Sequence, residues 1–401
     1  MKQNFRSLRN YNYRLWALGS LISYIGTWMQ RVAQTWLVLT ELTHNDARAV
    51  GFLTGLQFAP MLLLLPWTGL AADRVNRRTL LVATQACEGL LSAGLGILTI
   101  TGLVQLWHVY LLAFVFGCVN AFDTPASQSF ASDLVGEEHL SNAVALNATA
   151  FNAARLIGPG IAGLLIGMIG SGWVFELNAG SFAAVIGALA LMRVGDLHRN
   201  QEPSNSGMLE GFRYVWQHPS LRTALVMLFL VGTFALNFPL FISAMAVKVF
   251  HVDASRYGLL MSIMAIGSIG GAIIAAGSRR TSMRHLMAGS LLLTLGFAFA
   301  AGAPNYWLFG AALVLIGGAA VTFTTSTSSY MQLESVPSMR GRVMALRVAV
   351  AVGATPVGAP VLGWIAQTWG PRCCLLVATG ACALATLAAF RRITRRRAAS
   401  A

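Results

Sequence analysis

The sequence has little charge, and almost none of it is lysine. Only 10% of the 401 residues are Asp, Glu, Lys or Arg, whereas a soluble domain carries about 25%. Lysine occurs only as Lys2 and Lys248, and neither belongs to a G-x-x-x-x-G-K-[ST] pattern. The composition therefore argues against a soluble protein, and the lysines support neither a Walker-type ATP site nor a Schiff-base cofactor.

Cysteine and histidine are also scarce, and they are not grouped. The five cysteines lie in or beside apolar runs, and the seven histidines are scattered singly without zinc-like spacing. A polytopic membrane enzyme would need His, Asp or Glu clustered at one membrane face, and the sequence has no such cluster. We expect neither a metal nor a cofactor, and no enzymatic activity.

Long apolar runs dominate what is present, because hydrophobic types make up 56% of the residues. Twelve runs are long enough to cross the hydrocarbon core as helices, which satisfy their own backbone hydrogen bonds. They cover approximately residues 15–39, 50–71, 79–102, 106–131, 141–169, 173–192, 221–247, 257–277, 285–302, 306–332, 343–367 and 373–391. The sequence thus predicts an all-α polytopic membrane protein with twelve transmembrane helices.

The basic residues lie mainly in alternate loops. If the N-terminus is cytoplasmic, 22 of the 28 Lys and Arg fall on the cytoplasmic side, 4 fall outside and 2 lie within spans. By the positive-inside rule, this bias predicts that both termini are cytoplasmic. The net charge of +14 then reflects topology, and no nucleic-acid partner is needed to explain it.

The two halves of the chain resemble each other. Residues 143–170 and 343–370 match at an Ala-Leu pair and at three glycines, namely Gly158, Gly163 and Gly170 against Gly358, Gly363 and Gly370. Spans five and eleven run in the same direction, so the repeat predicts two parallel six-helix halves. Similarity between any two Gly- and Ala-rich helices is the alternative explanation. We expect an N-terminal half at 1–193, a cytoplasmic linker with a short amphipathic helix at 194–220, and a C-terminal half with a basic tail at 221–401.

Four charged residues stand out inside spans, where a charge is costly. They are Arg31, Glu88, Asp123 and Arg155. Burial favours the neutral form of a carboxylate, which lets such a group load and release a proton. Asp123 is the first candidate for proton coupling and Glu88 the second. A fixed ion pair, or a cap near Pro125, is the alternative role for Asp123.

Polar side chains recur at helical spacing on several spans, and such a face must point into the bundle or into a water-filled cavity. The candidates for a substrate cavity are Gln30, Arg31, Gln34, Asn120, Asn152, Arg155 and Asn237. The two arginines would bind an anionic substrate or neutralise the acidic residues. Gly158 and Pro159 are expected to bend the fifth helix.

Several motifs resemble one known family. The loop Gly69-Leu70-Ala71-Ala72-Asp73-Arg74-Val75-Asn76-Arg77-Arg78 is similar to the G-x-x-x-D-R-x-x-R-R/K signature of the major facilitator superfamily. Residues 28–39, 122–126, 154–159 and 340–346 are similar to its enterobactin-exporter-like, drug:proton antiporter branch. The antiporter signature G-x-x-x-G-P-x-x-G-G is only partly kept, because Ala154 and Ala162 replace two of its glycines.

This resemblance implies the major facilitator fold and secondary active transport by alternating access. It implies a proton-coupled exporter of a small amphipathic organic compound such as a drug, siderophore or metabolite. The signature loop, with Gly69, Asp73, Arg74, Arg77 and Arg78, would act as a gating latch; the alternative is a basic loop that only sets topology. A bacterial inner-membrane protein is expected, as a monomer in the lipid bilayer. An importer is the same-class alternative, and a polytopic enzyme or a channel is the alternative of another class.

Overall fold

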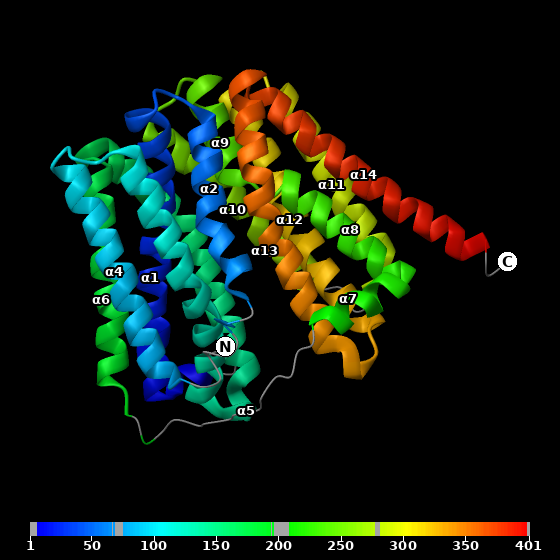
Figure 1. Cartoon of the computed structure of the whole chain (residues 1–401), viewed down its shortest axis with the longest axis horizontal. Helices are drawn as coiled ribbons and strands as arrows, with labels where there is room; N and C mark the ends of the chain where they lie inside the picture. Colours follow the sequence, from blue (N-terminus) through cyan, green and yellow to red (C-terminus); the bar gives the residue numbers. More distant parts are fainter. Residues whose placement is uncertain are drawn as a thin grey trace. The chain divides into compact units, whose positions relative to one another are not determined.

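A computed structural model describes residues 6–65, 67–68, 75–193, 195, 208–276 and 281–398. The described residues form helices and no strand (Figure 1). The first half contains η1 (Arg6–Arg9), α1 (Tyr11–Trp36), the π-helical turn η2 (Leu37–Leu42), α2 (Ala47–Leu63), α4 (Arg77–Ile100), α5 (Leu106–Ile169) and α6 (Ser171–Leu191). The remainder contains α7 (Met208–Gln217), α8 (Pro219–Phe234), α9 (Phe238–Lys248), α10 (Ala254–Ala276), α11 (Met283–Gly302), α12 (Tyr306–Glu334), η4 (Pro337–Met339), α13 (Arg340–Thr368) and α14 (Pro371–Ala398).

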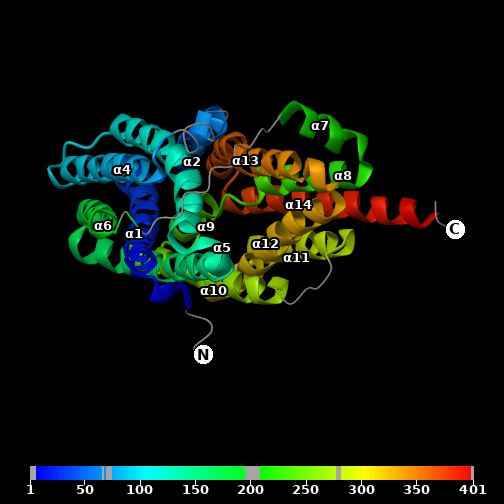
Figure 2. The same cartoon turned by 90° about the horizontal axis from the view of Figure 1, so that it is seen from below.

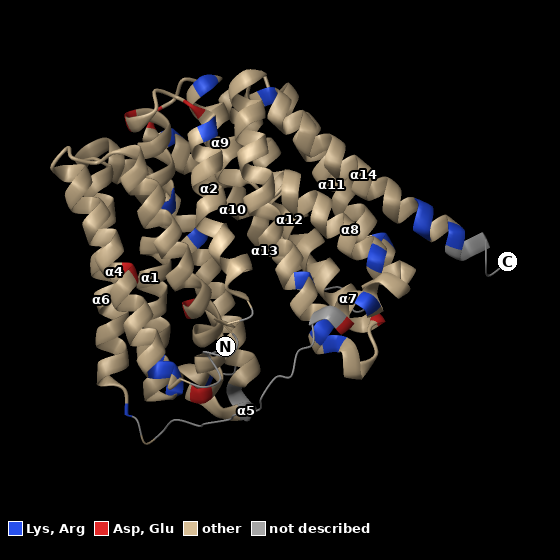
Figure 3. Cartoon of the chain, viewed as in Figure 1, with Lys and Arg blue, Asp and Glu red and all other residues tan. Residues whose placement is uncertain are grey.

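Ten helical segments among the described residues are long and apolar enough to cross a membrane. Two of them, Leu106–Gly136 and Leu140–Ile169, come from α5, and one, Pro219–Lys248, joins α8 and α9. The shorter apolar helix α2 and the polar-striped helix α1 supply the segments that correspond to the other two predicted spans. Charged residues occur mainly toward helix ends, with few along the helix middles (Figure 3). The chain is an all-helical, multi-pass membrane protein.

The chain divides into two compact units. Unit 1 consists of Met1–His44, Ala59–Pro203 and Asp253–Ser262, and unit 2 consists of Asn45–Phe58, Ser204–Val252 and Ile263–Ala401. Each unit therefore includes a short segment from the other half of the sequence: the start of α2 in unit 2 and the start of α10 in unit 1. The division at 1–193, 194–220 and 221–401 remains a prediction; α7 lies within the predicted linker.

Some helix ends differ from the predicted spans. The predicted span 221–247 is broken between α8 and α9, where Asn237 precedes α9 and Pro239 occupies its first turn. A proline in the first turn starts a helix well but cannot continue one, because it has no N–H. The predicted spans 106–131 and 141–169 lie in the single element α5, which kinks at Gly136, where φ is 68°. Glycine tolerates this left-handed conformation without a Cβ clash.

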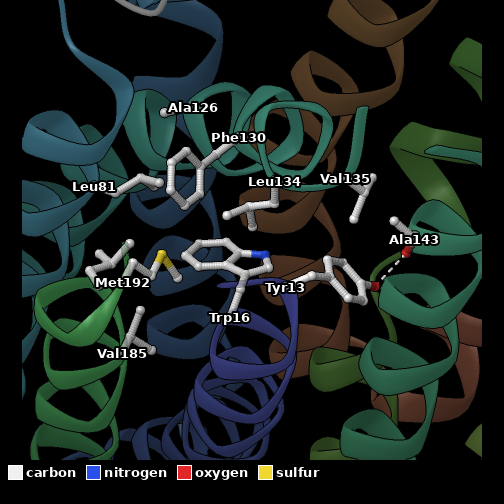
Figure 4. Close-up of a cluster of buried hydrophobic side chains, with 11 residues drawn as sticks. Tyr13, Trp16, Leu81, Ala126, Phe130, Leu134, Val135, Ala143, Val185 and Met192 are labelled. Atoms are coloured by element: carbon white, nitrogen blue, oxygen red, sulfur yellow. Dashed lines mark hydrogen bonds between the residues drawn. The ribbon is translucent and has the colours of Figure 1, made fainter. Parts of the chain in front are cut away.

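In unit 1, α1 packs against α5 and α6, and α4 packs against α5 and α6. Their apolar faces meet in a cluster around the two aromatic side chains Tyr13 and Trp16 of α1 (Figure 4). The Trp16 ring meets that of Phe130 edge to face, with 5.2 Å between centroids. The Tyr13 hydroxyl donates to the carbonyl oxygen of Ala143 at 2.9 Å. This cluster joins α1 to both arms of the kinked α5.

In unit 2, α11 packs against α12 and α14, and α8 packs against α13 and α14 (Figure 2). The linker helix α7 lies on α13, where Gly211 allows close approach to the backbone of Arg342. The Arg342 guanidinium forms a 2.9 Å ion pair with Glu210. Val215 of α7 is buried, whereas Phe212 and Trp216 are exposed. The amphipathic character of α7 therefore places one side on α13 and leaves two aromatic rings uncovered.

The aligned glycines of the internal repeat make equivalent contacts in the two units. A Cβ on Gly158 would lie 2.8 Å from Cβ of Trp28 in α1, and one on Gly358 would collide with the carbonyl oxygen of Thr233 in α8. Gly163 packs on the start of α10, and Gly363 packs on the start of α2. Glycine allows such close helix approach because it carries no side chain.

The equivalence extends to backbone conformation. Gly170 and Gly370 have φ values of 88° and 94°, and His44 and His251 both have φ of 49°. Each histidine lies two residues before an aspartate, Asp46 or Asp253, that accepts a backbone hydrogen bond at the start of the next helix. Similar strained positions at matching places are not expected from shared composition alone, so they support the sequence repeat.

Candidate functional site

The polar stripe of α1 is buried in unit 1. Ser20, Ser23, Gln30 and Gln34 are all buried, as the periodicity predicts for a face that looks into the bundle. The amide oxygen of Gln30, whose side chain is 6% exposed, accepts 2.5 Å hydrogen bonds from Ser92 and Asn178. Gln30 thereby links α1 to α4 and α6.

The two acidic candidates lie between α4 and α5. One carboxylate oxygen of Asp123 accepts a 2.6 Å hydrogen bond from the Thr84 hydroxyl and a 3.0 Å hydrogen bond from the Gln85 amide. Glu88 is 2% exposed and accepts from the Asn120 amide at 3.3 Å. Among the described residues, the hydrogen-bond donors to both carboxylates are neutral, and neither carboxylate forms a salt bridge.

This arrangement follows from helical spacing on α4. Gln85, Glu88 and Ser92 recur at intervals of three and four residues, which places them on one face. All three are buried. Asn120 of α5 also accepts from Thr124, one turn further along the same helix, at 3.3 Å. Short neutral side chains thus hold both acidic residues in place, and Glu88 also lies close enough to Arg31 for their charges to interact.

The two arginine candidates surround one tryptophan. The guanidinium carbon of Arg31 lies 5.0 Å from the centroid of the Trp28 ring, and that of Arg155 lies 5.6 Å from it. Both distances are within the range of a cation–π interaction. Phe151 meets Trp28 edge to face at 5.8 Å. The structure therefore brings Arg31 and Arg155 together around an aromatic ring, while Asp123 is bound by Thr84 and Gln85.

The remaining cavity candidates are placed separately. Asn152 donates to the carbonyl oxygen of Ala148 in its own helix at 2.8 Å. Asn237 belongs to unit 2, where it is buried at the break between α8 and α9 and donates to the Thr233 carbonyl oxygen at 2.8 Å. The Asn237 amide oxygen has no hydrogen-bond partner among the described residues. The first-half candidates thus belong to unit 1, and Asn237 marks a distinct polar point in unit 2.

Only part of the signature loop can be described. Gly69, Asp73 and Arg74 lie outside the described residues. Arg77 forms a 2.7 Å ion pair with Asp133 of α5, and the Arg78 guanidinium donates to the Leu189 carbonyl oxygen of α6 at 2.9 Å. The two basic residues at the start of α4 therefore contact both neighbouring helices.

Several polar partners were missed by sequence reasoning. Asp133 lies just beyond the predicted end of the span 106–131, so it did not stand out as a charge inside a span. Glu176 lies inside α6, and one of its carboxylate oxygens is buried without a hydrogen-bond partner among the described residues. Its position inside a predicted span was an available signal. The sequence gives no signal for Thr84 and Asn178. A neutral polar residue becomes a hydrogen-bond partner only when the packing of another helix brings an acceptor to it.

No group of three or more His, Cys, Asp or Glu side chains that could hold a metal ion occurs among the described residues. The candidate residues of unit 1 include two buried carboxylates, two guanidiniums and an aromatic cluster. Side chains of these kinds can exchange protons and can bind an organic molecule.

Comparison with known proteins places these features in a family. The family described as "Transmembrane secretion effector" matches residues 3–400. The chain is similar to the multidrug efflux pump Tap of Mycolicibacterium fortuitum, with 29% identity over 88% of each chain. It is also similar to the enterobactin exporter EntS of Shigella boydii serotype 18, with 26% identity over 82% of this chain and 79% of that protein.

Solved structures show the same fold. The crystal structure of the nucleoside transporter NupG matches 95% of this chain and 98% of its own, with a TM-score of 0.76 and 14% identity. The helical architecture, the repeated glycine contacts and the match along nearly the whole sequence agree with one another. The chain belongs to the transmembrane secretion effector family of major facilitator superfamily transporters.

Proposed function

We propose that this transporter is a proton-coupled exporter of a small amphipathic organic compound and works by alternating access in the bacterial inner membrane. The observation that carries the proposal is the pair of carboxylates between α4 and α5. Asp123 and Glu88 are held there by neutral hydrogen-bond donors. The names of two relatives, a multidrug efflux pump and an enterobactin exporter, support the direction of transport.

Asp123 is the proposed coupling site, with Glu88 as the second carboxylate. A buried carboxylate without a cationic partner gains little from staying ionised, so it can take up a proton from one side and release it to the other. A hydroxyl and an amide can hydrogen-bond either protonation state, because the hydroxyl also accepts and the Gln85 amide has an oxygen. Gln85 Oε1 is buried and has no partner among the described residues, so it is available to accept from a protonated carboxyl.

The proposed substrate contacts in unit 1 are Arg31, Gln34, Asn120, Asn152 and Arg155. Gln30 contributes indirectly, because its amide oxygen holds α1 to α4 and α6. In unit 2, the proposed contact is Asn237. Its amide lies where α8 and α9 are interrupted, and interrupted helices expose backbone groups that a bound molecule can use.

Gating is assigned to the signature loop with Gly69, Asp73, Arg74, Arg77 and Arg78. The contacts of Arg77 and Arg78 with α5 and α6 support this role, because they connect the start of α4 to helices on either side. Gly158 and Pro159 lie where α5 packs tightly against α1 and α10, and they are the proposed bend. The 22-to-4 distribution of basic residues supports cytoplasmic termini. A monomer contains every residue that this mechanism uses.

Gradient-driven transport tests the proposal. Purified protein is reconstituted into liposomes with an imposed pH gradient, and the movement of fluorescent ethidium and naphthalene-2-sulfonate is followed. Wild type, Asp123→Asn and Glu88→Gln are compared. The control is Glu210→Gln, which makes the same carboxyl-to-amide change at an exposed position on α7.

We expect gradient-driven movement of a probe by wild type and by Glu210→Gln, and its loss in Asp123→Asn. Downhill exchange of the probe without a gradient should persist in Asp123→Asn, because its binding groups remain. Equal gradient-driven transport by wild type and Asp123→Asn would overturn the assignment of Asp123. Transport by wild type that ignores the pH gradient would overturn proton coupling.

A further inference from the structure

The two arginines proposed as substrate contacts, Arg31 and Arg155, belong to a ladder of aromatic and basic side chains between α1 and α5. On α1, Tyr24, Trp28 and Arg31 follow one another at intervals of four and three residues, so they share a face. On the facing part of α5, Asn147, Phe151 and Arg155 recur every four residues. The Tyr24 hydroxyl donates to the Asn147 amide oxygen at 3.1 Å, which closes one end of the ladder.

Aromatic contacts continue from that end toward the arginines. The rings of Tyr24 and Phe151 meet edge to face at 5.5 Å, and those of Phe151 and Trp28 meet at 5.8 Å. Both guanidiniums then lie beside the Trp28 ring. The result is a surface that is apolar and flat at one end and carries two guanidiniums at the other, of which that of Arg31 also interacts with the carboxylate of Glu88. Phe151 is 41% exposed, so part of this surface is open to a second molecule.

Arg155 carries a charge that the protein does not compensate locally. Its Nε is buried and has no hydrogen-bond partner, and Arg155 forms no salt bridge within the described part of the chain. A guanidinium stays protonated in proteins, and leaving a partly buried charge such as that of Arg155 unpaired is unfavourable. A cation–π contact with Trp28 offsets only part of that cost. An anion bound at this position would supply the missing partner.

We propose that the ladder is a subsite for an organic anion, in which an acidic group binds Arg155 and Arg31 while an adjoining flat ring stacks on Trp28 and Phe151. A carboxylate, sulfonate or phenolate attached to an aromatic system has this shape and charge. The inference rests on the proposed transport function and names its substrate class. It selects anions over the cationic amphiphiles that a pump for organic compounds would otherwise accept.

Three matched naphthalenes test the charge preference by calorimetry on the purified transporter without any gradient. Naphthalene-2-sulfonate is permanently anionic, naphthalene-2-sulfonamide is neutral and nearly the same shape, and trimethyl(2-naphthyl)ammonium is cationic. We expect the sulfonate to bind at least about tenfold more tightly than either analogue, because charge-assisted hydrogen bonds are the stronger ones. Equal binding of all three, or tighter binding of the ammonium compound, would overturn the proposal.

Variants separate a ligand contact from a structural role. Arg155→Gln should lose the preference for sulfonate over sulfonamide, and Arg155→Lys should restore part of it. Trp28→Leu should lower the affinities for the sulfonate and for the sulfonamide by a similar factor of about a few-fold, so that the ratio of the two affinities is unchanged. Arg155→Gln should also melt no lower than wild type when no ligand is present, because it removes an uncompensated charge. A lower melting temperature together with an unchanged sulfonate-to-sulfonamide ratio would show that Arg155 is only structural.

An anionic lipid headgroup could bind the same two guanidiniums. A further experiment therefore distinguishes a lipid headgroup from a soluble organic anion. The calorimetry is repeated in nanodiscs of pure phosphatidylcholine and in nanodiscs containing phosphatidylglycerol. We expect the same affinity for naphthalene-2-sulfonate in both. Complete loss of sulfonate binding with phosphatidylglycerol would assign the ladder to lipid and overturn the proposal.

Binding and transport can fail independently. Selective sulfonate binding without any gradient-driven movement would leave the subsite in place and refute proton coupling. Proton-driven movement of ethidium with no sulfonate binding would keep the transport function and refute the subsite.

Discussion

The guanidinium of Arg77 and the carboxylate of Asp133 form a 2.7 Å ion pair that joins the start of α4 to α5. Both side chains are largely buried, with 17% and 8% of their surface exposed. Arg77 belongs to the signature loop, so this pair connects the end of that loop to α5. A polar link at this place ties a predicted gating segment to a helix that also carries the proposed coupling carboxylate, Asp123.

Breaking this pair should destabilise unit 1. We expect Asp133→Asn to lower the free energy of unfolding by about 3 kcal/mol, because a buried guanidinium is left without its counter-charge. The measurement is chemical or thermal unfolding in detergent. Asp46→Asn is the matched control, since it breaks the more exposed Asp46–Arg48 pair; surface pairs contribute about 1 kcal/mol or less. Equal losses in the two variants would contradict the structural role of Asp133.

Close glycine packing on α10 gives a second prediction. A Cβ on Gly258 would collide with the Pro159 carbonyl oxygen and lie 3.1 Å from Cα of Gly163, whereas nothing lies within 4 Å of a Cβ on Gly270 of the same helix. We expect Gly258→Ala to cost about 1–3 kcal/mol through overpacking and Gly270→Ala to be neutral or stabilising. Unfolding of the two variants in detergent provides the comparison. A neutral Gly258→Ala would mean that α5 and α10 are not in close contact.

Gln30 offers a test of structure against substrate binding. Gln30 accepts from Ser92 and Asn178, and the Ser92 hydroxyl can also donate to the Phe175 carbonyl oxygen. Gln30→Leu should therefore leave the buried Asn178 amide without this acceptor and cost about 1–3 kcal/mol. The affinity of the folded variant for a transported probe should change by less than about threefold, since the amide oxygen is engaged with α4 and α6. Melting temperature and calorimetric affinity are measured on the same preparation. A large loss of affinity at unchanged stability would instead make Gln30 a substrate contact.

The pH dependence of stability should include a contribution from Asp46, in the loop before α2. Hydrogen bonds from the Arg48 side chain and backbone hold the pKa of Asp46 below its ordinary value of 3.8. A lowered folded-state pKa stabilises the fold at pH values above 3.8, and the contribution is lost as the pH falls through the lowered pKa. The melting-temperature difference between wild type and Asp46→Asn should be constant from pH 8 to 5 and shrink below pH 4. A difference that grows on acidification would contradict the sign.

The internal repeat shows where sequence and structure agree in detail. Aligned glycines at positions 158 and 358, and at 163 and 363, make equivalent contacts. The sequence predicts that these glycines are equivalent, because a repeat preserves spacing and spacing determines which helical face a residue occupies. The helices that they contact were not visible, because a glycine carries no information about its partner. The clearest case is the start of α10, which contacts α5 within unit 1.

The candidate site divides in the same way. The sequence identified the rare charges at depth, since each departs from an apolar background. It left their partners open: a fixed ion pair was one alternative for Asp123, which accepts from Thr84 and Gln85, while Arg155 lies beside Trp28. Thr84, Asn178 and Trp28 are common in membrane helices, so they attract no notice until the packing of neighbouring helices brings them to a charge.

By itself, the sequence determined that the chain is a multi-pass helical membrane protein of this family. Hydrophobic length, the alternation of basic loops and the repeat are properties of linear order, and lipid allows few other structures. Only the tertiary structure decided that Asp123 accepts hydrogen bonds from neutral side chains and that Arg155 has no salt-bridge partner among the described residues. It also decided that the Trp28 ring lies beside both arginines. Those relationships depend on the rotation and crossing of separate helices, because distances across a bundle are set by side-chain packing that no single segment encodes.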